Sequence, residues 1–171
     1  MQSIVLGGGC FWCVEAVFSA IDGVQSAISG YMGGEAQTAN YEAVCTGESG
    51  HVEVVKITFD EQVIDLYEIL TVFFAMHDPT TLNRQGNDIG TQYASVIFVN
   101  DEQETIAKQK LDELKQQGIH AVTHILPVQE FYPAENYHQQ FFVSNPSQPY
   151  CHFVILPKMM KLKTEFGHLL R

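Results

Sequence analysis

Basic residues are scarce in this chain. Of its 171 residues, 9 are lysine or arginine and 20 are aspartate or glutamate, which gives a formal net charge of −11 at pH 7. Nucleic acids and anionic lipids attract proteins through clustered positive charge, and no basic cluster offsets the acidic excess here. The composition therefore argues against nucleic acid and the membrane surface as partners.

Long apolar runs are also lacking, since no stretch approaches the roughly 20 residues that a membrane-spanning helix needs. The chain opens with Met1, Gln2 and Ser3 and continues into a predicted strand, without the basic and apolar segments of a secretory leader. We therefore expect a cytoplasmic protein. No linker or internal repeat divides the sequence, so residues 1–171 are expected to form a single domain, long enough to bury a core without disulfides or metal.

Cysteine is limited to four positions: Cys10, Cys13, Cys45 and Cys151. In a chain of this size and expected compartment, four thiols indicate chemistry or incidental use more than a disulfide framework. Two of them, Cys10 and Cys13, follow directly after a glycine triplet. That segment is therefore the first candidate for a functional site.

The glycine triplet separates a short apolar run, residues 3–6, from a helical pattern over residues 14–21. This order places Cys10 at a helix start, where free backbone N–H groups and the helix dipole favour a thiolate. The sequence therefore predicts a lowered pKa and a nucleophilic sulfur at Cys10. Cys13 shares a helix face with Cys10, so a modest backbone adjustment would allow a disulfide between them. A buried, inert cysteine pair is the alternative.

Phe11 and Trp12 separate the two cysteines, and Trp12 is the only tryptophan in the chain. In the first helical turn, aromatic rings of this size can enclose an apolar group in a cleft beside Cys10. Packing in the core is the alternative that composition leaves open.

Glu53 is the acidic residue that the strand pattern singles out. Residues 51–60 alternate, with Val55, Ile57 and Phe59 on the apolar side, and Glu53 falls on that same side. Burial disfavours the charged form of a carboxyl group, so a protonated Glu53 would suit a general acid. The alternative is a register in which Glu53 is exposed near the strand end.

The other predicted elements mix helices and strands without regular alternation. The patterns predict strands over residues 24–32, 93–99 and 122–129, and helices over residues 64–76, 100–117, 158–170 and from residue 134. Residues 35–50 and 80–92 are polar and show no periodicity. Because the alternation of a doubly wound parallel sheet is absent, we predict an α+β fold, a two-layer α/β sandwich with a mixed sheet.

Six motifs, taken together, resemble one known family. They are GCFW (9–12), GYMGG (30–34), TGESGHVE (46–53), HDPTT (77–81), GNDIGTQY (86–93) and FYPAENYHQQ (131–140). In this order they resemble the A-type peptide methionine sulfoxide reductases from residue 4 to about residue 151, whereas the last twenty residues are less diagnostic. The resemblance implies a two-layer fold with a ferredoxin-like core.

The resemblance also implies a thiol enzyme that reduces methionine-S-sulfoxide, free or in oxidised proteins, and so repairs oxidative damage. On that basis Cys10 attacks the sulfoxide sulfur, Glu53 assists proton delivery to the oxygen, and a sulfenic acid forms on Cys10. A second cysteine then forms a disulfide that thioredoxin or another dithiol reduces. No metal and no organic cofactor are implied.

Five further residues are implied to form the substrate pocket. Tyr31 and Tyr93 are expected to hydrogen-bond near the sulfoxide oxygen, and Asp88 is expected to hold substrate and water. Phe11 and Trp12 are expected to enclose the methyl group. From the pattern alone, Asp88 is an ordinary turn residue and Tyr93 a strand aromatic.

Two cysteines compete for the resolving role. Many members carry glycine or serine in place of Cys13, and Tyr150-Cys151 resembles the C-terminal site from which other members draw their resolving cysteine. Closing the short loop from Cys10 to Cys13 needs little chain rearrangement, so we expect Cys13 to react first and Cys151 to carry the disulfide outward. The rigidity of a helix start argues against this order. No role for Cys45 follows from the sequence.

Two rival functions share the Cys10–Cys13 motif. Cys-X-X-Cys between a strand and a helix is also typical of thioredoxin-like oxidoreductases, which the five other motifs disfavour. A zinc module would use Cys10, Cys13, Cys151 and His152, but the chain has no second closely spaced pair.

Overall fold

The computed structural model describes residues 1–171. Its centre is a six-stranded sheet with the strand order β7-β6-β1-β3-β2-β8. The strands are β1 (Gln2–Gly8), β2 (Val24–Met32), β3 (Val52–Phe59), β6 (Ser95–Val99), β7 (His124–Pro127) and β8 (Tyr132–Pro133). The β6–β7 pair is parallel and the other pairs are antiparallel, which confirms the predicted α+β fold with a mixed sheet.

Apolar residues alternate along β1 and β3 and supply both faces of the sheet. Ile4, Leu6 and Val55 belong to the main core, whereas Val5 and Val54 belong to a smaller cluster. Side chains of successive strand residues point to opposite faces, so this division shows that the sheet is covered on both sides. The two strands therefore lie at the centre, where a buried polar side chain is shielded from water.

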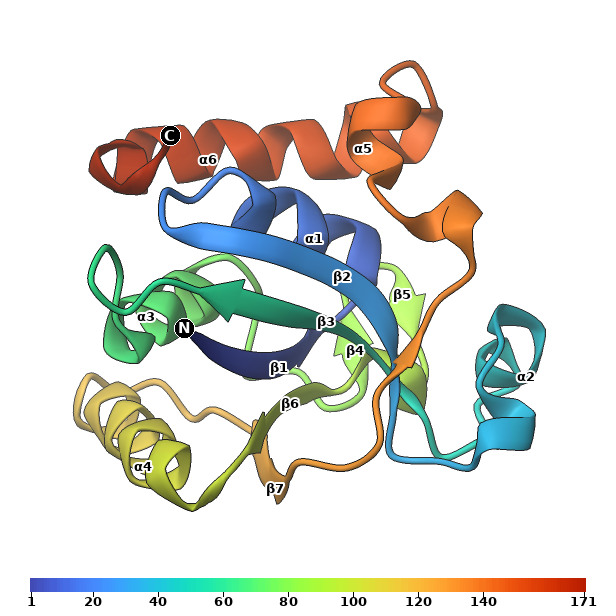
Figure 1. The fold of residues 1–171 in the computed structure, drawn as a ribbon, viewed down its shortest axis with the longest axis horizontal. Coiled ribbons are helices and arrows are strands. Elements are labelled where there is room, and N and C mark those ends of the chain that lie inside the picture. The colour runs from blue at the N-terminus through green and yellow to red at the C-terminus, as the bar shows by residue number, and fades with distance from the viewer.

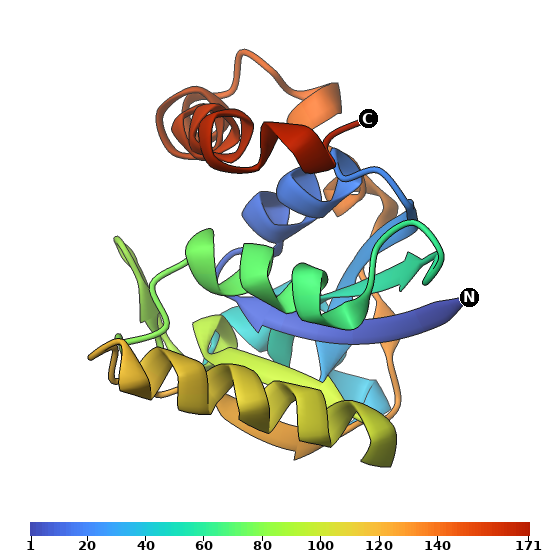
Figure 2. The ribbon, with the colours of Figure 1, turned by 90° about the vertical axis from the view of Figure 1, so that its left-hand side faces the viewer.

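Four long helices contribute to the main core. They are α1 (Phe11–Ser19), α3 (Leu66–Ala75), α4 (Asp101–Gln116) and α6 (Leu156–Phe166), which contributes Leu162 and contacts α1. Figure 1 shows α6 running along α1, and Figure 2 shows α6, α1, α3 and α4 in that order from top to bottom. None of the helices combines the length and apolarity needed to cross a bilayer.

Local sequence explains where α4 begins. The Asn100 side chain accepts a hydrogen bond from the backbone N–H of Gln103 at 2.9 Å, and the Gln103 side chain accepts one from the backbone N–H of Asn100 at 3.1 Å. This reciprocal capping box satisfies two N–H groups that a helix start otherwise leaves free. Gly118, with φ +82°, follows the end of the helix, and this left-handed conformation favours glycine there.

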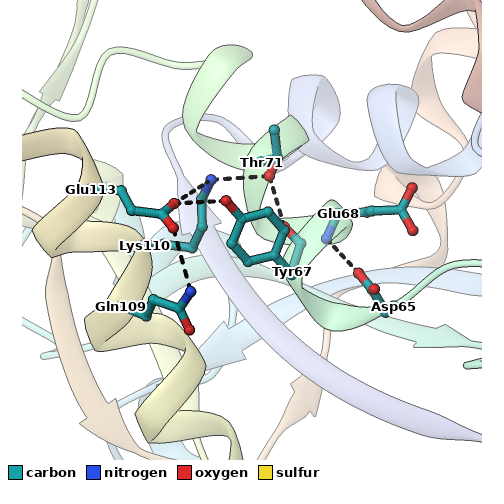
Figure 3. Close-up of polar contacts among 7 residues, drawn as sticks. All are labelled: Asp65, Tyr67, Glu68, Thr71, Gln109, Lys110 and Glu113. Carbon is teal, nitrogen blue, oxygen red and sulfur yellow. Dashed lines mark hydrogen bonds and ion pairs between the residues drawn. The ribbon is translucent and has the colours of Figure 1, made fainter. Parts of the chain in front are cut away.

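A polar cluster joins α3 to α4 (Figure 3). Lys110 of α4 donates a hydrogen bond to the Thr71 hydroxyl at 3.0 Å and forms an ion pair with Glu113 at 3.4 Å. The Tyr67 hydroxyl donates to the same Glu113 carboxylate at 2.8 Å. Lys110 is only 8% exposed, and these partners compensate the burial of its charge. The cluster therefore fixes how the two outer helices pack.

The polar stretch 35–50 contains a helix that the sequence analysis missed. α2 (Tyr41–Cys45) begins where the Asn40 side chain accepts a hydrogen bond from the backbone N–H of Ala43 at 2.9 Å. Asparagine is a strong helix N-cap, so Asn40 was the available signal. The helix has only five residues, too few to show a 3.6-residue period.

Two predicted boundaries are wrong. Tyr93 lies in a 3₁₀ turn, Thr91–Tyr93, so the strand β6 begins at Ser95 instead of Tyr93. The helix predicted from residue 134 is reduced to a 3₁₀ turn, Asn136–His138, and the four-residue α5 (Phe141–Ser144). Gln140 between them has φ +52°, a left-handed conformation that interrupts a right-handed helix.

Candidate active site

Cys10 lies between β1 and α1, at the end of the glycine triplet. It is the N-cap of α1, and its carbonyl oxygen accepts a hydrogen bond from the backbone N–H of Cys13 at 3.1 Å. Gly9 has φ +97°, and a Cβ atom there would lie 2.6 Å from the Gln85 side chain. The turn that presents Cys10 at the helix start therefore requires glycine.

Three of the four cysteines meet in one buried cluster. Cys10 is 9% exposed, Cys13 5% and Cys151 0%, and they pack together with Ala16 and Ile155. Cys151 comes from a single π-helical turn, Cys151–Ile155, that leads into α6. All three are thiols in this structure. The fold thus brings together the cysteines for which the sequence predicts redox roles, whereas Cys45 is exposed on α2.

The ionisation of Cys10 differs from the prediction. Burial raises the pKa of the Cys10 thiol, and its interaction with Cys13 and the charge of Glu53 raise it further. The backbone N–H of Trp12 lowers this pKa, which is the expected effect of a helix start, but it is the smaller effect. The prediction of a lowered pKa is therefore wrong for this closed, reduced site, because burial outweighs the helix start.

Cys13 is the more acidic thiol of the pair. Hydrogen bonding with Cys10 lowers the pKa of Cys13 to about 7, and Lys158 and the Tyr150 hydroxyl lower it further, against the effect of burial. The Tyr150 oxygen and the Cys13 sulfur lie 3.6 Å apart. Of the two thiols, Cys13 is therefore the one that ionises more readily.

Glu53 lies on the buried side of β3, which confirms the predicted register. Its side chain is 1% exposed, and its Oε1 accepts a hydrogen bond from the backbone N–H of Phe11 at 3.1 Å. The other oxygen, Oε2, is buried without a hydrogen-bond partner. Burial raises the pKa of Glu53 to about 8, against the Phe11 N–H, and the charges of Asp88 and Cys13 add to the rise. Most Glu53 carboxyls are therefore protonated at neutral pH.

Two tyrosine hydroxyls lie within electrostatic reach of Glu53 and Cys10. They belong to Tyr93, which the sequence analysis named, and to Tyr41 of α2, which it missed. Burial raises the pKa of both phenols, and negative charge on Glu53 and Cys10 contributes to both shifts. These hydroxyls therefore remain protonated and can donate hydrogen bonds in the site.

Tyr31 does not occupy the position that the resemblance implies. It is fully buried, and its hydroxyl donates to Oε1 of Glu135 at 2.9 Å. Burial and this carboxylate raise the pKa of Tyr31. The other Glu135 oxygen accepts a hydrogen bond from the backbone N–H of Tyr41 at 3.0 Å. Tyr31 thus holds the carboxylate that anchors α2. The charge of Glu53 affects both tyrosines, but only Tyr41 is also affected by Cys45 and Cys10.

Aromatic rings surround Trp12. Its indole N–H donates to Nδ1 of His138 at 3.1 Å, the Phe141 ring stacks on it with centroids 3.8 Å apart, and Tyr150 meets it edge-on at 5.6 Å. Phe11 is fully buried in the main core and offers its backbone N–H, instead of an open ring face, to the site. The structure therefore places Trp12, more than Phe11, at the boundary between the site and the C-terminal segment.

Asp88 lies at the start of β5 (Asp88–Ile89), which pairs with β4 (Arg84–Gln85) in a small hairpin. Its carboxylate accepts a hydrogen bond from the Tyr150 hydroxyl at 2.8 Å. A cavity of about 340 Å³ separates this hairpin from the C-terminal segment, and Cys10, Cys13 and Lys158 also line it. Asp88 thus links the hairpin to the segment that carries Cys151.

A nucleophilic thiol, a neutral carboxylic acid, phenolic donors and an aromatic surface meet at the start of α1. This set can attack an electrophilic sulfur or carbon and protonate the group that leaves, after which neighbouring thiols can form a disulfide. No group of three or more His, Cys, Asp or Glu side chains is arranged to hold a metal ion.

Comparisons with known proteins agree on one family. The model of the peptide methionine sulfoxide reductase family matches residues 2–169. The chain is 58% identical to a peptide methionine sulfoxide reductase MsrA of Psychrobacter cryohalolentis, over 98% of this chain and 97% of that protein. Reduced Mxr1 of Saccharomyces cerevisiae superposes with a TM-score of 0.82 at 35% identity, over 88% of this chain and 89% of the yeast chain. Mxr1 in complex with Trx2 gives a TM-score of 0.57 at 26% identity, over 82% and 84% of the two chains.

Proposed function

This chain belongs to the peptide methionine sulfoxide reductase family and reduces methionine sulfoxide to methionine; we propose that Cys10 is the attacking thiol and that the S epimer is the substrate. The observation that carries this proposal is the pairing of Cys10 with a buried, protonated Glu53 whose second oxygen has no partner. Sulfoxide oxygen leaves poorly until it is protonated, so the reaction needs a thiol and a neutral acid in one site.

In the first step, the Cys10 sulfur attacks the sulfoxide sulfur and Glu53 donates its proton to the sulfoxide oxygen. The oxygen then passes from the methionine sulfur to the Cys10 sulfur as the bond between the two sulfurs breaks, and the proton of the Cys10 thiol replaces the one that Glu53 gave. Methionine leaves reduced by two electrons, and Cys10, oxidised by two electrons, is a sulfenic acid. In this proposal Tyr93 and Tyr41 donate hydrogen bonds to the oxygen, and Asp88 holds substrate and water. Trp12 supplies an apolar surface for the methyl group, with Phe11 behind it.

In the second step, Cys13 attacks the sulfenic acid of Cys10, a disulfide forms and water leaves. The contact between the two thiols supports Cys13 as the first resolving cysteine. Cys151 packs in the same cluster, and the charge of Cys13 contributes to the raised pKa of Cys151 after the effect of burial. This sequence of contacts supports passage of the disulfide from Cys10–Cys13 to Cys151 by thiol exchange.

Thioredoxin is the reductant in this proposal, and the yeast Mxr1–Trx2 complex supports it. All three clustered cysteines are less than a tenth exposed, so the C-terminal segment must move before a protein dithiol can reach them. We include in the proposal that residues 1–171 act as one domain, that the protein works in the cytoplasm, and that no metal or organic cofactor takes part. Stoichiometric zinc in the purified protein would contradict the last point.

An epimer-resolved assay tests the substrate. The reduced protein is supplied with methionine-S-sulfoxide or methionine-R-sulfoxide, with thioredoxin as reductant, and methionine is measured chromatographically. We expect turnover of the S epimer and little or none of the R epimer. A site that fixes the methyl group, the oxygen and the attacking sulfur at the same time distinguishes the two epimers. Equal rates on both epimers would contradict the pocket described.

Cys13→Ser and Cys151→Ser test the order of the thiols. We expect both variants to release one methionine per enzyme, and Cys13→Ser to depress thioredoxin-supported cycling more strongly, because Cys13 contacts Cys10 directly. Mass spectrometry after one turnover identifies the disulfide in each protein. If Cys151→Ser stops cycling and accumulates the Cys10 sulfenic acid while Cys13→Ser is nearly silent, the proposed order is wrong.

Tyr41→Phe and Tyr31→Phe form a matched pair, since each removes one hydroxyl. We expect Tyr41→Phe to slow the first turnover about 10- to 100-fold, the range for losing a hydrogen bond to a group that gains charge. Tyr31→Phe leaves Glu135 with one unpaired oxygen, so we expect a loss of about 1–3 kcal/mol in the free energy of unfolding. Single-turnover rates and thermal unfolding separate the two effects. A slow first turnover in Tyr31→Phe and a merely destabilised Tyr41→Phe would show that Tyr31 is the hydrogen-bond donor to the substrate.

A further inference from the structure

Lys158 of α6 is a cation that lacks an acidic partner. The four ion pairs of the structure involve the N-terminus, Lys108, Lys110 and Lys161, but not Lys158. Its Nζ atom instead donates a hydrogen bond to the carbonyl oxygen of Met76, after the end of α3, at 3.4 Å. The residue is half-buried in a strongly acidic protein. Surface charge pairing therefore does not account for its position.

Lys158 and Cys13 lie on the same cavity walls. Two separate cavities, of about 340 Å³ and about 10 Å³, are both lined by Gly8, Cys13 and Lys158. The larger one opens toward Asp88 and Tyr150, and the smaller one lies between α1 and α3. Residues that line two neighbouring cavities form the wall between them, so Cys13 and Lys158 share this wall.

No other positive charge faces Cys13. The titratable groups around it are the thiols of Cys10 and Cys151, the carboxyls of Glu53 and Asp88, the Tyr150 phenol, His77 and Lys158. His77 is neutral, because burial lowers its pKa to about 4. The other neighbours are thiols, carboxyls and a phenol, which are neutral when protonated and negative when ionised. Lys158 is thus the one group whose charge favours a thiolate at this position.

We propose that Lys158 is a positioning residue for the resolving step, which keeps Cys13 poised as the thiolate that attacks the oxidised Cys10. The inference rests on the proposed function and adds a residue to it. In this step the Cys13 thiolate bonds to the Cys10 sulfur as the S–O bond of the sulfenic acid breaks. Hydroxide leaves and takes up a proton to give water, the Cys13 sulfur is oxidised and the Cys10 sulfur is reduced.

The structural alternative is that Lys158 only holds α6 against α3. Lys161, one turn further along α6, makes the same kind of contact, donating to the carbonyl oxygen of Ala75 at 2.7 Å. Lys161 is exposed, pairs with Glu165 and lines neither cavity. It therefore provides a matched control for the helix contact without the charge beside Cys13.

The test compares Lys158→Met, Lys158→Arg and Lys161→Met in the full chain. Reduced protein is mixed with one equivalent of methionine-S-sulfoxide without thioredoxin, and samples are quenched with a thiol-alkylating reagent at timed intervals between pH 5.5 and 9.5. Methionine release reports the first step, and mass spectrometry of the Cys10–Cys13 peptide reports disulfide formation. Alkylation of Cys13 in the unreacted protein reports its ionisation directly.

We expect Lys158→Met to release methionine at the wild-type rate but to form the disulfide about tenfold more slowly at pH 6.5, because a pKa one unit higher reduces the thiolate tenfold. The pH midpoints of disulfide formation and of Cys13 alkylation should both move upward, and the rates should converge above pH 9. Lys158→Arg and Lys161→Met should resemble the wild type.

Unchanged midpoints in Lys158→Met would overturn the inference even if its disulfide forms slowly, since a packing defect lowers a rate without shifting a titration. An equal effect of Lys161→Met would overturn it as well. If the proposed function itself is wrong, the wild-type protein releases no methionine, which distinguishes that outcome from a failure of this inference.

Discussion

Cys10→Ser is expected to abolish the reduction of methionine-S-sulfoxide while leaving the fold intact. A serine hydroxyl is not appreciably ionised near neutral pH and is a far weaker nucleophile than a thiol. It therefore cannot attack the sulfoxide sulfur, and the sulfoxide oxygen is not removed. Serine is close in size to cysteine and can keep the N-cap role that Cys10 has in α1, since serine is itself a preferred N-cap. The variant should therefore lose its rate of methionine release but keep the melting temperature of the wild type.

Methionine release by the reduced variant, followed chromatographically over hours, measures the residual rate. Cys45→Ser is the matched control, because it makes the same substitution at an exposed cysteine of α2 outside the buried cluster. We expect that control to retain the wild-type rate. Turnover by Cys10→Ser above the uncatalysed background would mean that another thiol attacks the sulfoxide.

Glu53→Gln is expected to slow the first turnover by about 10²–10⁴, the usual contribution of a general acid. The amide keeps an oxygen that can accept the Phe11 N–H bond but carries no acidic proton for the sulfoxide oxygen. In the wild type the rate should fall above pH 8 as Glu53 loses its proton, and this fall should be missing in the variant. Stopped-flow fluorescence of Trp12, the only tryptophan, can follow the reaction.

The same variant is expected to be more stable than the wild type at pH 8. The folded pKa of Glu53, about 8, lies above the ordinary value of 4.5, so its neutral form favours folding below pH 4.5. That contribution is lost as the pH rises from 4.5 to 8, because the unfolded chain ionises first. Glutamine does not titrate, so the melting temperature should rise by about 3–8 °C at pH 8 and little at pH 4.5.

Glu15→Gln is the control for the effect on rate. Glu15 is another buried carboxyl, 3% exposed on α1, whose pKa is raised by burial, and its oxygen accepts a hydrogen bond from Ser29 at 3.3 Å. It lies outside the cysteine cluster, so we expect its loss to leave the single-turnover rate unchanged. A fast Glu53→Gln enzyme would show that the proton comes from elsewhere, with the Tyr93 and Tyr41 phenols as the next groups to substitute.

The sequence by itself determined the parts of the site that depend on local pattern. A strand, a glycine turn and a helix place Cys10 at the start of α1, because only glycine tolerates the conformation of Gly9. The two-residue period of β3 places Glu53 on the buried side, since one face of that strand packs against the main core. Six motifs in order were enough to predict the family.

Only the tertiary structure decided which residues from distant parts of the chain lie near Cys10 and Glu53. Tyr41, unlike Tyr31, lies within electrostatic reach of Cys10 as well as Glu53, and it is carried by a five-residue helix too short to show a period. Cys151 and Lys158 reach Cys13 through the packing of α6 on α1, a contact between segments more than 130 residues apart that no local pattern encodes. Burial then reversed the expected acidity of Cys10, because desolvation acts on the completed fold and outweighs the field of a single helix start.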